Sequence, residues 1–167
     1  MQNKKITRMA FFTALAMIFS YIETMIPFNI GIPGIKLGLA NIIAVWALYV
    51  FEFREAVLIS FLRVVLIGFL FGNPVGIIYS LSGAGLSLIV MGILKKTELF
   101  HCITISIYGG VFHNIGQIIA AVFIVENYKI IYYVPVLMIV GTFTGLLIGI
   151  VSFEVLKRTI HIFKKEV

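Results

Sequence analysis

Six long apolar stretches, separated by short segments that carry Gly, Pro or charge, constrain this chain more than any other feature of its sequence. Each stretch is close to the roughly 17–25 residues that an α-helix needs to cross a bilayer. The sequence therefore predicts an all-α membrane protein, a six-transmembrane-helix bundle forming one integral membrane domain over residues 1–167. The predicted spans cover residues 6–26, 34–51, 55–71, 75–94, 103–125 and 132–156.

The composition agrees with a chain built for lipid. Of the 167 residues, 61% are hydrophobic and 12% are charged, whereas soluble domains usually carry about 25% charged residues. Lipid tails act as the solvent for such a chain, so the apolar surface need not be hidden. The single cysteine, Cys102, excludes an internal disulfide, and we expect it to fill apolar space.

Several function classes lack the residues that they require. The sequence contains no Asp, and Mg²⁺–diphosphate sites are commonly built from carboxylate clusters. We find no nucleotide-binding motif, no paired metal-ligand spacing and no catalytic triad. The sequence therefore predicts a protein that is not an enzyme and that holds no cofactor or metal. We expect no nucleic-acid partner, because the cations lie between apolar runs.

The cations predict the orientation in the membrane. Lys36 and Lys129 fall on one side of the predicted bundle, and Arg63 lies within a span. The other side of the bundle carries ten of the thirteen cations, and it is predicted to be cytoplasmic because Lys and Arg concentrate in cytoplasmic loops. Both termini are predicted to lie on that side. The chain is therefore expected to be a multi-pass protein of the cell membrane. Those ten are Lys4, Lys5, Arg8, Arg54, Lys95, Lys96, Lys157, Arg158, Lys164 and Lys165.

Arg63 is the most conspicuous polar residue within an apolar stretch. An arginine at the centre of a membrane helix costs roughly 2.5–3.5 kcal/mol on insertion scales. We therefore expect Arg63 to face the bundle interior, a water-filled cavity or an anionic partner. Two interpretations stay open, namely a contact with a ligand and a structural pairing with a carboxylate or backbone carbonyls.

A second polar cluster lies in the fifth apolar stretch. His113, Asn114 and Gln117 are spaced three and four residues apart, so they share one broad helix face. The neighbouring Gly110 and Gly116 would let a ligand or another backbone approach closely. The cluster suits a binding cavity, and it also suits interhelical hydrogen bonds, which are worth roughly 0.6–2 kcal/mol each.

The connections on the predicted external side carry further candidates. Residues 23–41 form a largely apolar segment rich in Gly and Pro, with Lys36 and Asn41 near its end. Such a loop suits a lid over a site, and the alternative is an ordinary surface connection in which Glu23 pairs with Lys36. Asn73 lies in the next external turn. Ser80 follows, and its hydroxyl either lines the same cavity or bonds back to a helix carbonyl.

Small residues at four-residue spacing indicate faces where helices pack closely. Ala10 and Ala14 form such a pattern in the first stretch, and Gly83 with Ser87 forms another in the fourth. In the last stretch the pattern is Gly141, Gly145 and Gly149.

Several short blocks together resemble the Gx transporter family, which was historically labelled heptaprenyl diphosphate synthase component I. The resemblance covers nearly the whole chain. It rests on Pro33-Gly-Ile-Lys-Leu-Gly-Leu-Ala-Asn-Ile42, Glu55-Ala56, Leu62-Arg63-Val64, Phe71-Gly72-Asn73, Ser80-Leu-Ser-Gly-Ala84 and His113-Asn114-x-Gly116-Gln117.

That family is similar to the S components of energy-coupling factor (ECF) transporters. S components are small six-helix proteins that capture a vitamin or a similar micronutrient outside the cell and dock on a transmembrane coupling subunit with two ATPases. The resemblance implies a partner-docking face at Ala10 and Ala14, and a substrate site on the external side next to membrane lipid. The candidate substrate-binding residues are Lys36, Asn41, Arg63, Asn73, Ser80, His113, Asn114 and Gln117.

Two other functions remain open from the sequence. The old family label suggests a noncatalytic membrane subunit associated with heptaprenyl diphosphate synthesis. A structural membrane subunit of a redox or cofactor system would use Arg63 and the polar face of the fifth helix only for packing.

Overall fold

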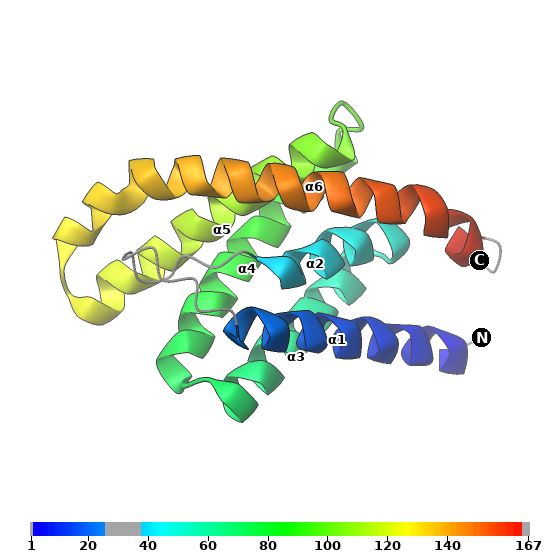
Figure 1. The fold of residues 1–167 in the computed structure, drawn as a ribbon, viewed down its shortest axis with the longest axis horizontal. Helices are drawn as coiled ribbons and strands as arrows, with labels where there is room; N and C mark the ends of the chain where they lie inside the picture. The colour runs from blue at the N-terminus through cyan, green and yellow to red at the C-terminus, as the bar shows by residue number, and fades with distance from the viewer. Residues whose placement is uncertain (1, 26–37, 165–167) are drawn as a thin grey trace.

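The regular elements of the protein are helices wherever a computed structural model describes it, in residues 2–25 and 38–164. Six α-helices and one short 3-10 helix follow one another along these described residues (Figure 1). This confirms the all-α, six-helix part of the prediction. The elements are α1 (Gln2–Met25), α2 (Leu39–Val50), α3 (Phe53–Phe71), α4 (Pro74–Lys96), α5 (Cys102–Val125), η1 (Tyr128–Tyr133) and α6 (Val134–Lys164).

In the part of the chain that the structure describes, four helices are long and apolar enough to cross a membrane, so the chain is a membrane-embedded protein. The two other helices, α2 and α3, are less clear as membrane spans. α2 has 12 residues and is therefore about 18 Å long, against roughly 30 Å for the hydrocarbon core. α3 carries Arg54, Glu55 and Arg63 among its 19 residues. Six crossings therefore stay a prediction. The four candidate spans are Asn3–Met25, Pro74–Lys96, Cys102–Val125 and Tyr128–Ile160.

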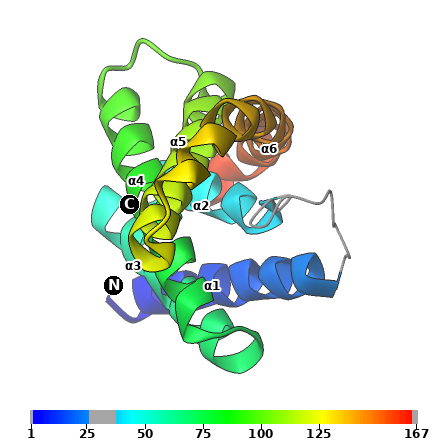
Figure 2. The ribbon, with the colours of Figure 1, turned by 90° about the vertical axis from the view of Figure 1, so that its left-hand side faces the viewer.

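The short α2 lies inside the protein. Its residues from Ile42 to Leu48 are all buried, as expected of a helix that is apolar on every face. α2 contacts α1, α3 and α6, and Figure 2 shows it between α1 and α6. The buried ring of Phe12 packs against Trp46, with ring centroids 4.4 Å apart, and against Phe51 at 5.0 Å. Protein side chains therefore take the place of lipid around α2.

Glycines bring the backbones of α4, α5 and α6 together. A Cβ added at Gly116 would lie 2.5 Å from the Ser82 carbonyl oxygen, and one added at Gly110 would lie 2.4 Å from the Gly141 carbonyl oxygen. Only residues without a side chain permit such contacts. Further backbone or side-chain contacts of this kind confirm the close packing predicted for Gly83, Gly141, Gly145 and Gly149.

We expect Gly110→Ala to lower the melting temperature of the protein in detergent. The added methyl group must push α6 away from α5, and overpacking of this kind typically costs about 1–3 kcal/mol. Gly85→Ala is the matched control, because no atom lies within 4 Å of its added Cβ and alanine favours the helix by up to ~1 kcal/mol. Equal melting temperatures for the two variants, measured in one detergent, would contradict the close α5–α6 contact.

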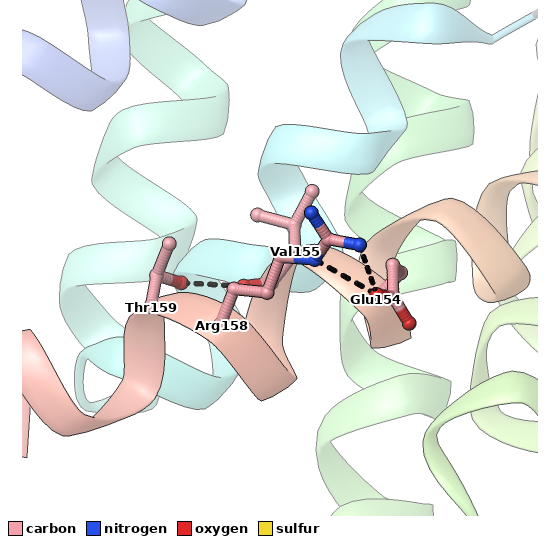
Figure 3. A network of polar contacts seen from close by, with 4 residues as sticks. All are labelled: Glu154, Val155, Arg158 and Thr159. Atoms are coloured by element: carbon pink, nitrogen blue, oxygen red, sulfur yellow. Dashed lines mark hydrogen bonds and ion pairs between the residues drawn. The ribbon is translucent and has the colours of Figure 1, made fainter.

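Charged side chains gather at the end of the molecule that holds both termini. The N-terminal end of α1 and the C-terminal end of α6 lie together, and the turn between α5 and α6 lies at the opposite end (Figure 1). Lys5 pairs with Glu55, which joins the first turns of α1 and α3. On α6 the exposed Arg158 pairs with Glu154 at 2.7 Å (Figure 3). Exposed i,i+4 ion pairs on a helix contribute only about 0.3–0.5 kcal/mol to the stability of the fold.

Candidate functional site

A cavity of about 230 Å³ lies where the C-terminal halves of α1 and α3 meet the N-terminal turns of α2 and α4 and the middle of α5. It is smaller than the roughly 300–1,000 Å³ typical of pockets for drug-sized ligands. Its apolar walls include Val64, Ile67, Phe71 and Ile77. The polar or charged side chains among its described lining are Ser20, Glu23, Thr24, Asn41, Arg63, Asn73, Ser80, His113 and Gln117.

A tight connection between α3 and α4 shapes one side of this cavity. The Asn73 side chain accepts a hydrogen bond from the Gly76 backbone N–H at 2.7 Å, so it caps the N-terminus of α4. Pro74 follows in the first helical turn, where its missing N–H costs no intrahelical bond. The sequence Asn73–Pro74 thus ends one helix and starts the next within a few residues. This brings Ser80 of α4 and Arg63 of α3 to the same cavity.

Arg63 is held only weakly by the surrounding protein. Its Nη1 donates to the Ser20 hydroxyl at 3.3 Å, which is longer than the usual 2.9–3.0 Å. The buried Nε has no hydrogen-bond partner within residues 2–25 and 38–164. Glu23 interacts with Arg63 electrostatically across the cavity, but in the described part of the chain no ion pair joins the two. Among these residues, the structural partners of Arg63 therefore amount to one long hydrogen bond and an electrostatic interaction without an ion pair.

Glu23 has a second contact, at the N-terminus of α2. Its Oε1 accepts a hydrogen bond from the backbone N–H of Gly38. Gly38 is the residue before α2 and has a φ of 74°, in the left-handed region that favours glycine. Glu23 therefore connects the last turns of α1 to the start of α2, and it does so beside the cavity.

His113 and Gln117 reach the cavity because α4 carries a glycine opposite them. A Cβ added at Gly83 would lie 3.0 Å from the His113 Nε2 and 2.9 Å from the Gln117 Cγ. Any larger residue at position 83 would displace one of these side chains. The sequence predicted Gly83 only as a helix-packing residue. Its second role is to leave room for His113 and Gln117, and this role depends on which residues of α5 face Gly83.

Asn114 lies apart from its two neighbours on α5. Its Nδ2 donates to the Leu137 carbonyl oxygen of α6 at 2.7 Å, and it is not among the described residues that line the cavity. Successive residues of an α-helix are turned by about 100°, so Asn114 faces α6 while His113 and Gln117 face α4. The interhelical hydrogen bond was one of the two roles that the sequence left open for this cluster.

The remaining sequence-predicted residues fall into three groups. Asn41, Asn73 and Ser80 line the cavity with Arg63. Lys36 lies outside the described residues, as does most of the predicted lid loop. Ala10 and Ala14 are exposed on α1, far along the helix from the cavity residues at its C-terminal end.

Sequence reasoning missed the contribution of α1 to the cavity. Ser20 and Thr24 line it together with Glu23, which the sequence placed only at the start of the possible lid and as a partner for Lys36. Ser20 and Thr24 are four residues apart, so their shared polar face was a signal available in the sequence. Within residues 2–25 and 38–164, no three His, Cys, Asp or Glu side chains are grouped as metal ligands.

Comparison with known proteins adds one match. Residues 12–155 match the family model described as heptaprenyl diphosphate synthase component I. No curated protein and no solved structure matches the chain. The matched range contains every described residue that lines the cavity.

Proposed function

The chain belongs to the heptaprenyl diphosphate synthase component I family, and from this premise we propose that it is the substrate-binding, S-component-like subunit of an ECF-type transporter. Its substrate would be a small micronutrient or cofactor-like molecule. The observation that carries the proposal is the cavity, which combines a weakly held arginine, several hydrogen-bonding side chains and apolar walls. Ligand pockets commonly combine largely apolar walls with a few polar groups that fix orientation.

The proposed topology has six crossings with both termini in the cytoplasm. The end of the molecule near the termini carries Lys5, Arg54 and Lys95 among its cations, which favours the cytoplasmic side. The cavity then lies toward the external side, because it is built at the opposite ends of α1 and α3. In α3 the cost of Arg63 is reduced, since the side chain faces the cavity rather than lipid.

The proposed docking face for a transmembrane coupling subunit is on α1. Ala10 and Ala14 are one turn apart and exposed, and small residues let the backbones of two membrane helices approach closely. ATP hydrolysis in two further partner subunits would then drive release of the captured molecule into the cell.

We expect the tagged protein, purified from its native membrane in mild detergent, to bring with it a coupling subunit and two ATPases. Ala14→Leu should reduce their recovery about tenfold, because 1.4 kcal/mol of lost docking energy has that effect. Thr142→Leu, at an exposed position of α6, is the matched control and should leave recovery unchanged. Mass spectrometry of the co-purified proteins gives the amounts.

A second candidate function follows from the name of the family. As a noncatalytic membrane component, the chain would anchor a partner that makes heptaprenyl diphosphate. The same purification separates the two functions. Recovery of a prenyl diphosphate synthase subunit without ATPases would contradict the transporter proposal and favour the second candidate.

A further inference from the structure

Arg63 is the one Lys or Arg side chain in the described lining of the cavity, and most of its donors are unused. A guanidinium carries five N–H donors in a planar fork. Among residues 2–25 and 38–164, Arg63 makes one hydrogen bond, from Nη1 to the Ser20 hydroxyl at 3.3 Å, and its buried Nε has no hydrogen-bond partner. Buried donors without an acceptor cost free energy, and more so on a charged group. The guanidinium therefore has donors left for an acceptor that enters the cavity.

The carboxylate of Glu23 lies in the same lining, but it has partners of its own. It accepts the Gly38 N–H at the start of α2, and it has a further interaction besides. It acts on Arg63 electrostatically, and no ion pair joins the two in the described part of the chain. We therefore assign Glu23 to the connection between α1 and α2, and we assign no group of a ligand to it.

The surface next to Arg63 on α3 is apolar. Val64 follows Arg63 directly, and Ile67 and Phe71 lie about one and two turns further along the helix. At a rise of 1.5 Å per residue, this apolar stripe extends about 12 Å from Arg63. Ile77 of α4 lines the same space. Along α3 the cavity thus places a guanidinium at one end of an apolar surface.

From this arrangement we propose that the captured molecule is a monocarboxylate with a short apolar chain. Its two carboxylate oxygens accept hydrogen bonds from the guanidinium of Arg63, a contact that is frequently bidentate. Its chain lies along Val64 and Ile67. A phosphate group, with a charge of about −1.5 to −2 at pH 7, would exceed the single positive charge of Arg63. This inference rests on the proposed capture function and deepens it by giving the chemical class of the captured molecule.

The volume limits the chain length of such a ligand. At about 30 Å³ for each molecule of liquid water, a cavity of 230 Å³ corresponds to roughly eight waters. A ligand with about eight non-hydrogen atoms, such as hexanoate, has this size. We therefore expect the affinity to rise from acetate through butyrate to hexanoate, by roughly fourfold for each buried methylene. Octanoate should bind no more tightly than hexanoate, because its chain exceeds the cavity.

The test compares ligands that differ only in the charged group. The purified full-length protein in lipid nanodiscs is titrated with these four carboxylates by calorimetry, and protein-free nanodiscs correct for partition into lipid. Each carboxylate is matched by the neutral amide and by the alkylamine of the same chain length. We expect at least one carboxylate to bind about tenfold or more tightly than both of its matched compounds, because only the carboxylate pairs with Arg63.

Two variants separate the fork of Arg63 from its charge. Arg63→Lys keeps the positive charge but lacks the planar bidentate contact, so we expect the preferred carboxylate to lose about tenfold in affinity. Arg63→Leu removes both and should bring the carboxylate and its amide within about twofold of each other. Arg54→Leu, exposed and outside the described lining, is the matched control and should keep the parent preference. Melting temperatures measured in parallel verify that each variant is folded.

Four results would overturn the carboxylate proposal. They are equal or tighter binding of the matched amides or alkylamines by the parent protein, unchanged carboxylate affinity in a folded Arg63→Lys, an unchanged preference for the carboxylate in a folded Arg63→Leu, and no binding of any carboxylate by the parent. None of these decides the capture function, which is tested separately by recovery of the coupling subunit and ATPases.

Discussion

Arg63→Leu is expected to abolish capture of the small molecule while leaving the ligand-free protein at least as stable as the parent. A central arginine costs roughly 2.5–3.5 kcal/mol on insertion scales, whereas leucine is favourable. The substitution removes one long hydrogen bond to Ser20 and the electrostatic interaction with Glu23, with which Arg63 forms no ion pair. In the complex, Arg63 would pair with an anionic group of the bound small molecule. Removing one partner of a buried charge pair costs about 2–5 kcal/mol, which lowers the affinity for the small molecule roughly 30-fold to several thousandfold.

The readout for Arg63→Leu is the small molecule that co-purifies with the protein, quantified by mass spectrometry, together with the melting temperature after the ligand is removed. Arg54→Leu, at the exposed start of α3 and away from the cavity, is the control for loss of a cation. A strongly lowered melting temperature with retained small molecule would show that Arg63 is a structural residue. It would contradict a role for the charge of Arg63 in binding the small molecule.

Ser80→Phe is expected to block the cavity while preserving the fold. Ser80 lines the cavity from α4 and is partly buried, so an aromatic ring at this position occupies space that the ligand needs. Because the ring enters existing space rather than a packed contact, we expect the melting temperature to fall by little or to rise. Retention of the co-purifying small molecule should fall below detection.

Ile78→Phe is the matched control for Ser80→Phe. Ile78 is on the same helix, is 50% exposed and does not line the cavity, so the larger ring extends toward the surroundings of the protein. Equal loss of the small molecule in both variants would contradict a role for the cavity. It would indicate instead that bulk on α4 disturbs the protein in general.

The number and type of helices could be predicted from apolar stretches, but not the role of each helix. The stretch that becomes α2 is as apolar as a membrane span, because burial by protein and burial by lipid select the same residues. Only the tertiary contacts show that α1, α3 and α6 enclose it, with Phe12 of α1 packed against Trp46 of α2. Its first predicted residues, 34–37, lie outside the described range.

The candidate site could be predicted in part for a similar reason. A polar side chain in an apolar stretch costs free energy wherever it lies, so Arg63, His113 and Gln117 were conspicuous in the sequence. The direction in which each points depends on neighbouring helices, which is why Asn114 bonds to α6 instead of lining the cavity. Glu23 was not predicted as a cavity residue, because that role requires α1 to pack against α3.

Native mass spectrometry of the protein released from its own membrane is the direct test of small-molecule capture. We expect a small-molecule adduct on the parent and on Ile78→Phe, and no such adduct on Ser80→Phe or Arg63→Leu. A parent protein that carries no adduct, or an adduct of the same mass and amount on Ser80→Phe, would contradict the claim that this cavity captures a small molecule.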